Sequence, residues 1–93
     1  MAQVTVTLPA LLKPFAGQAG KISLKANTVH GALMVLCGRF PSLKPLMFDE
    51  EGALRTHVLC FHNESNSRWS EEGLCRPLKT GDQLTIIQAV AGG

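Results

Sequence analysis

One amphipathic helix set between strand-like segments constrains the fold of this 93-residue chain more than any other feature. Apolar residues recur there at spacings of three and four, which gives a helix with one apolar stripe: Val29, Ala32, Leu33, Leu36 and Phe40. Thr28 is the predicted N-cap, because its hydroxyl can accept a hydrogen bond from an unpaired backbone N–H. Pro41 ends the helix, since a proline pushes the residue before it out of the helical region. Strands before and after one long helix predict an α+β domain with a mixed sheet wrapped around that helix.

Two segments of alternating apolar and polar residues precede the helix. Residues 3–8 alternate around Val4 and Val6, and residues 21–25 alternate around Ile22 and Leu24, so both are predicted to be strands of one hairpin. A long connection, residues 10–20, joins them. Its apolar members are expected to pack against the core and to keep the connection ordered: Leu11, Leu12 and Phe15.

Residues 54–62 form the most strand-like segment in the middle of the chain. Strand periodicity places Val58 and Cys60 on one face, and Leu59 and Phe61 on the other. One helix can cover only one face of a sheet, so one apolar pair should be exposed, which is typical of a binding surface. The compact pair suits close packing under the helix. We therefore predict that Leu59 and Phe61 face outward and bind a partner protein. The reverse register, with Val58 and Cys60 on the partner surface, stays open, because periodicity alone does not fix which face is inside.

The end of the chain combines a strand with a slender apolar tail. A turn at residues 79–82 leads into a predicted strand at residues 83–87, after a weakly signalled strand or turn at residues 74–78. Ala89, Val90 and Ala91 follow, and the sequence stops at Gly92 and Gly93. Glycine is costly to order and has no Cβ, so we expect a flexible tail whose backbone can enter a narrow channel. The predicted organisation is a domain at 1–88 and a tail at 89–93.

Composition excludes several classes of function. The net charge of +2 is small and no run of Lys or Arg occurs, so the sequence does not favour nucleic-acid binding. No apolar run approaches the roughly 18 residues that span a bilayer, and the N-terminus lacks the regions of a signal peptide. A cytoplasmic location is therefore expected. The three widely spaced cysteines form neither a disulfide framework nor a pair of metal-binding knuckles, and reduced thiols are expected.

A catalytic site is not predicted. His57, Cys60 and His62 are close in sequence, but strand parity puts His57 on the face opposite His62. Cys60 and His62 alone are too few for a zinc site, and nothing supplies the third group that Cys–His catalysis needs. The chain is therefore expected to be no enzyme and to bind no metal or cofactor. The terminal carboxylate is the group with chemical promise.

Several motifs resemble those of the bacterial ubiquitin-like sulfur carriers, which have the β-grasp fold and include the thiamin sulfur carrier and the molybdopterin synthase small subunit. Residues 4–9 (VTVTLP) resemble the first strand of that family, and residues 28–33 (TVHGAL) resemble its helix start. The most specific match is residues 77–87 (PLKTGDQLTII), running into the diglycine. The length and the central strand look most like the carriers of cysteine and thioquinolobactin biosynthesis. Gln88 departs from the family, where many relatives have proline.

The resemblance implies a defined chemistry. An enzyme of the ubiquitin-activating type would adenylate the Gly93 carboxylate with ATP, and sulfide or a persulfide would displace AMP to leave a thiocarboxylate. A biosynthetic enzyme would accept the sulfur, in the cysteine branch on an aminoacrylate held by pyridoxal phosphate, and a metalloprotease would restore the tail. ATP, zinc and pyridoxal phosphate would belong to those partners. Gly92 and Gly93 are the implied reactive site, with Leu59, Phe61 and residues 89–91 as the partner-binding set.

Three other functions stay open on these residues. One is a molybdopterin synthase small subunit, which would form a lasting complex with a large catalytic subunit. Another is a protein modifier that joins Gly93 to lysines through isopeptide bonds. The third is a β-grasp interaction module whose gene continues beyond Gly93, which a stop codon after Gly93 would exclude.

Overall fold

The structure is a computed structural model that describes residues 1–63, 65–66 and 73–88. Its strands are β1 (Ala2–Thr7), β2 (Lys21–Ala26), β3 (Val58–His62), β4 (Ser65–Asn66) and β5 (Gln83–Gln88). Its α-helices are α1 (Val29–Arg39) and α2 (Lys44–Met47), with short 3₁₀ turns at Lys13–Ala16, Pro41–Leu43 and Gly73–Cys75. The predicted tail, residues 89–93, lies outside the described residues.

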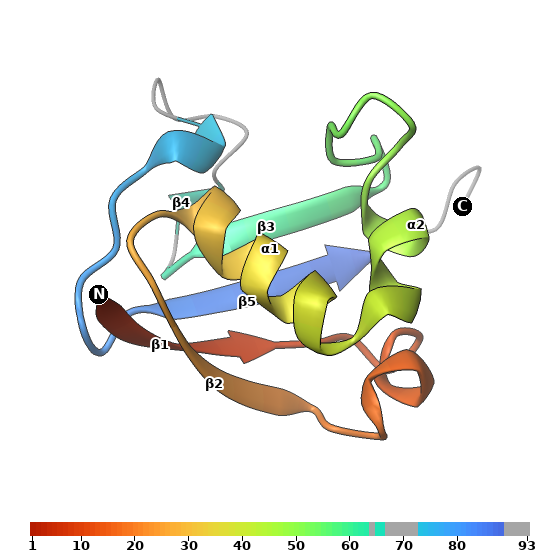
Figure 1. Cartoon of the computed structure of the whole chain (residues 1–93), viewed down its shortest axis with the longest axis horizontal. Coiled ribbons are helices and arrows are strands. Elements are labelled where there is room, and N and C mark those ends of the chain that lie inside the picture. The colour runs from red at the N-terminus through yellow and green to blue at the C-terminus, as the bar shows by residue number, and fades with distance from the viewer. Residues whose placement is uncertain (64, 67–72, 89–93) are drawn as a thin grey trace.

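The five strands form one mixed sheet in the order β2-β1-β5-β3-β4, with α1 lying across one of its faces (Figure 1). β1 pairs with β2 in antiparallel register and with β5 in parallel register, and β5 pairs antiparallel with β3. The last strand of the sequence therefore lies at the centre of the sheet, between the first strand and β3. This arrangement confirms the predicted α+β class and the mixed sheet around one main helix.

The helix α1 begins and ends where the sequence predicts. The Thr28 hydroxyl accepts a hydrogen bond from the Gly31 N–H at 3.0 Å, which satisfies one of the unpaired donors of the first turn. The last helical residue is Arg39, and Pro41 begins the next turn. The stripe is buried against the sheet from Val29 to Leu36, joined by Cys37, whereas Phe40 is half-buried at the helix end.

The connection between β1 and β2 differs from its prediction. Leu12 packs into the core and is 2% exposed, but Leu11 and Phe15 are 62% and 45% exposed. The turn Lys13–Ala16 is a 3₁₀ helix with about three residues per turn, so it can aim only part of its surface inward. That inward surface holds Ala16, which is buried, in place of Phe15.

The middle strand is shorter than predicted. β3 begins at Val58, and Leu54 instead forms an isolated bridge with Phe48 after α2. Arg55 explains the change, because its backbone N–H bonds the Met47 carbonyl and its carbonyl accepts the Val58 N–H, which makes a turn at this point. The turn before β5 is as predicted: Asp82 N–H donates to the Lys79 carbonyl, and Gly81 has φ +98°, a conformation that suits glycine.

Candidate functional site

The two faces of β3 separate as the strand periodicity predicts. Val58 and Cys60 are fully buried in the core, while Leu59 and Phe61 are half-buried on the face opposite α1. The predicted register is therefore confirmed. The partner-binding role of Leu59 and Phe61 stays a prediction.

A third apolar side chain joins that pair from the neighbouring strand. Leu59 lies directly opposite Ile87 in the antiparallel register of β3 and β5, and Ile87 is 41% exposed. Directly opposed residues on one face of a sheet have their Cβ atoms about 4.5–5.5 Å apart, so their side chains are neighbours. Leu59, Phe61 and Ile87 are called the apolar patch below. The sequence analysis placed Ile87 in the final strand but missed its part in this surface, which strand parity from Ile86 would have shown.

The apolar patch lies at the end of β5 from which the chain continues toward Gly93. Ile87 is followed by Gln88, the last residue of β5, which pairs with Val58 at the start of β3. Gln88 and Val58 therefore lie next to the patch, at the end of β5 (Figure 1). The predicted site residues Ala89, Val90, Ala91, Gly92 and Gly93 lie outside the described residues.

The other half of the same sheet face is polar. β1 presents Gln3, Thr5 and Thr7 on this face, and the outward residues of β2 are Lys21, Ser23 and Lys25. The side chains of Gln3 and Ser23 are joined by a hydrogen bond of 3.2 Å. The apolar character of the open face is therefore confined to β3 and β5.

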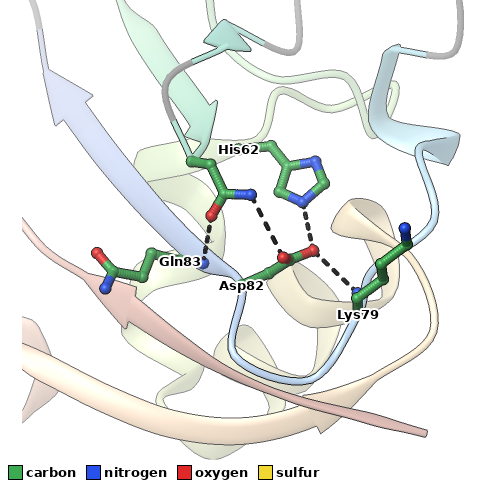
Figure 2. A network of polar contacts seen from close by, with 5 residues as sticks. His62, Lys79, Asp82 and Gln83 are labelled. Atoms are coloured by element: carbon green, nitrogen blue, oxygen red, sulfur yellow. Dashed lines mark hydrogen bonds and ion pairs between the residues drawn. The ribbon is translucent and has the colours of Figure 1, made fainter.

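A polar network, in which only the His62 ring is buried, ties the start of β5 to the end of β3 (Figure 2). The ring of His62 is 6% exposed, and its Nε2 lies 2.6 Å from Asp82 Oδ2. The same oxygen accepts the Lys79 backbone N–H at 2.9 Å, and Asp82 Oδ1 accepts Asn63 Nδ2 at 3.3 Å. The hydrogen bond from Lys79, followed by that from His62, lowers the pKa of Asp82 to about 2.

Asn63 clamps the first residue of β5. Its backbone N–H donates to the Gln83 carbonyl at 2.7 Å, and its side-chain oxygen accepts the Gln83 N–H at 2.9 Å. Asn63 has φ +56°, a left-handed conformation that asparagine tolerates better than most residues. The network therefore fixes the register of β5 against β3, and with it the position of Ile87. Sequence reasoning missed it, because Asp82 is twenty residues from its partner His62.

The described residues offer little that could act as a nucleophile or a metal site. Cys60 and His62 do not converge on a metal, since His62 binds Asp82, and no group of three metal-ligating side chains occurs in residues 1–63, 65–66 and 73–88. Burial raises the pKa of Cys60 to about 12 and also raises that of Cys37, so both thiols stay protonated and unreactive. No helix within the described residues is long and apolar enough to cross a membrane.

Comparison with known proteins gives concordant results. The model of the ThiS family matches residues 6–93. The sulfur carrier protein CysO of Mycobacterium tuberculosis is 30% identical over 92 residues, which cover 97% of this chain and 98% of the relative. A chain of the BexX/CysO complex of Amycolatopsis orientalis is 33% identical, with a TM-score of 0.85 and coverage of 97% and 99%. The small archaeal modifier protein 1 of Methanosarcina acetivorans is also 33% identical with a TM-score of 0.85. The match covers 100% of this chain and 98% of the modifier protein.

These similarities extend over the whole sheet, the helix and the sequence up to Gly93. They agree with the β-grasp architecture and with the motifs at residues 4–9, 28–33 and 77–87. The chain belongs to the ThiS family of ubiquitin-like β-grasp proteins.

Proposed function

We propose that this protein is a sulfur carrier, whose Gly93 carboxylate is adenylated by a partner enzyme and then converted to a thiocarboxylate. The observation that carries the proposal is the family match, which runs through the diglycine to residue 93, together with full-length similarity to the sulfur carrier CysO. Two of the three cysteine thiols, those of Cys37 and Cys60, are buried, and that of Cys75 is exposed.

The chemistry needs only the terminal carboxylate from this chain. A carboxylate oxygen attacks the α-phosphorus of ATP on the partner enzyme, pyrophosphate leaves, and the acyl adenylate that forms is a good electrophile. Hydrogen sulfide then attacks the carbonyl carbon and AMP leaves, which gives the thiocarboxylate after loss of a proton. A biosynthetic enzyme receives the sulfur, and a metalloprotease trims the tail where the product stays attached to it. ATP, zinc and pyridoxal phosphate are assigned to these partners.

The apolar patch is the proposed docking surface for the activating enzyme. Leu59, Phe61 and Ile87 lie beside the point where the chain leaves β5, so one partner can cover the patch and receive residues 89–93 at once. Burial of each side chain contributes roughly 1.5–3 kcal/mol before the costs of association. This energy places the tail in the active site without any contact to the reacting carboxylate.

Intact-mass measurement tests the carrier chemistry. With the cognate activating enzyme, ATP and sulfide, the chain should gain the mass expected when one oxygen is replaced by sulfur, and fragmentation should place the change at Gly93. The matched control is the chain without Gly92 and Gly93, which should not change. The proposal is wrong if the shortened chain gains the same mass.

A second candidate function follows from the similarity to the small archaeal modifier protein 1. A modifier would use the same acyl adenylate but pass Gly93 to lysine side chains. Affinity-tagged protein expressed in its native cell should then yield many isopeptide adducts, identified by the remnant of residues 80–93 that trypsin, cutting after Lys79, leaves on the modified lysine. A sulfur carrier should give few adducts, and a molybdopterin synthase small subunit should instead copurify with one large subunit.

A further inference from the structure

The β2 edge of the sheet carries a row of backbone groups that no strand of the described residues covers. Among the strands that the structure describes, β2 pairs with β1 alone. In an antiparallel pair alternate residues turn their N–H and C=O toward the partner strand, and Gly20 does so, because its carbonyl accepts the Leu8 N–H. The backbone N–H and C=O groups of the intervening residues therefore point away from the sheet: those of Lys21, Ser23 and Lys25. Within the described chain this row has one hydrogen bond, from Arg39 Nη1 to the Ser23 carbonyl at 3.1 Å.

A groove accompanies this edge. It has a volume of about 410 Å³ and lies where β2 meets α1, with both polar and apolar lining: Gln3, Ser23, Leu24, Lys25, Val35 and Arg39. Val35 is 40% exposed and supplies the apolar part on the helix side. The edge therefore combines outward backbone groups, of which the Ser23 carbonyl is bonded to Arg39, with an apolar contact, and these are the two features that an added strand requires.

The charge around the groove is of one sign. The first acidic residue of the sequence is Asp49, so β1, β2 and α1 contain no carboxylate side chain. Residues 1–48 carry five cations, namely Lys13, Lys21, Lys25, Arg39 and Lys44. The net charge of +2 hides this asymmetry, because the second half of the chain is acidic. A segment that lies on β2 meets an uncompensated positive field.

We propose that an extended acidic segment of a partner protein adds to β2 as a further strand. Beside β2, the added residues that flank Lys21 and Lys25 would be acidic, and the alternate residues would be apolar and contact Val35. A second copy of this chain does not fit, because two β2 edges would set lysine against lysine. The proposal does not depend on the chemistry of the tail, since β1 separates β2 from β5.

A synthetic peptide of alternating glutamate and valine tests the proposal by NMR titration of the full chain. Amide shifts should be largest at Lys21, Ser23 and Lys25. Two N-methylated peptides give the sharper test, one methylated at its odd-numbered residues and the other at its even-numbered residues. Only one of these two sets of N–H groups faces β2. Methylation of that set should weaken binding about tenfold or more, and methylation of the other set by less than about twofold. Equal effects of the two phases would overturn strand addition.

Two protein variants complete the test. Lys25→Glu should lower the affinity for the peptide about tenfold. Lys79→Glu, at an exposed lysine away from the groove, should change this affinity little. Ser23→Pro removes one outward N–H, a position where an edge strand tolerates proline, and should also weaken binding. Deletion of Gly92 and Gly93 should leave peptide binding intact, which separates this surface from the carrier function. The proposal is wrong if the peptide does not bind at millimolar concentration, or if a short single-stranded RNA competes with it for the same residues.

Discussion

Ile86 and Ile87 are identical neighbours on the central strand, but they lie in different surroundings. Ile86 is 1% exposed and opposes Cys60 beneath α1, while Ile87 is 41% exposed and opposes Leu59 on the open face. The two residues thus separate the two uses of apolar surface in this protein. The inward side chain stabilises the fold, and the outward one keeps surface that a partner can bury.

The same division holds along β3. Val58 and Cys60 are compact and buried, whereas Leu59 and Phe61 are larger and only half-buried. Because one helix covers one face, the larger apolar residues of this strand are left where they contribute less to folding. Four predictions test this contrast, from the largest expected effect to the smallest.

The isoleucine pair should show the largest difference. Ile86→Ala should lower the free energy of unfolding by about 2–5 kcal/mol, because it removes buried methyl groups and leaves a cavity. Ile87→Ala should cost less than about 1 kcal/mol, since its side chain already contacts water. Urea denaturation of the two variants measures both values. Equal losses would contradict the division of the two faces.

Phe61→Ala should separate binding from stability. We expect the affinity for the activating enzyme to fall by about tenfold or more, the equivalent of about 1.4 kcal/mol, with a small change in melting temperature. Thr7→Ala, on the polar half of the same face, is the control and should leave affinity unchanged. If Phe61→Ala instead costs the roughly 3–5 kcal/mol typical of a core phenylalanine, the apolar patch is structural.

The N-cap of α1 tests how much the helix over the inward face of the sheet contributes to the stability of the fold. Thr28→Ala should lower the free energy of unfolding by about 1 kcal/mol, because the Gly31 N–H loses its acceptor. Thr28→Ser keeps a hydroxyl and should lose much less. Neither variant should alter enzyme binding, since the cap lies on the helix side of the sheet; weaker binding in Thr28→Ala would show that the two faces are coupled.

The Asp82 network should make stability depend on acid. The pKa of Asp82 in the folded chain is about 2, below its usual 3.8, so the ionised carboxylate favours the folded state. This contribution is present above about pH 4 and is lost as the pH falls toward about 2. Asp82→Asn lacks this titration. The unfolding free energies of the unchanged protein and of Asp82→Asn should therefore converge as the pH falls from about 4 to about 2. A difference that stays constant over this range would show that the Asp82 network does not cause the acid dependence of stability.

Local patterns in the sequence predicted most of the fold. The stripe of α1, its cap at Thr28 and the two faces of β3 all follow from periodicity and side-chain chemistry, and the structure confirms them. The outward position of Leu11 and Phe15 was missed, because the course of a long connection depends on contacts that periodicity does not encode. The start of β3 was misplaced for a similar reason, since Arg55 is held in a turn by Met47.

The candidate site divides in the same way. Leu59 and Phe61 could be assigned from strand parity together with the compactness of Val58 and Cys60. The contact between His62 and Asp82 instead depends on how distant strands pair. The roles of Gly92 and Gly93 rest on family resemblance, because glycine carries no side chain from which chemistry can be read. A sequence therefore predicts the faces of single strands better than the contacts between them.

The central place of β5 has a mechanical consequence. The strand that ends in Gln88 is hydrogen-bonded to β1 on one side and to β3 on the other, and the pairs with β3 extend to its final residue. A force that draws on the chain beyond Gln88 runs along β5, so it loads both ladders in shear at once. An edge strand under the same force would be held by one ladder instead of two. A pull on the chain beyond Gln88 should therefore leave the domain folded.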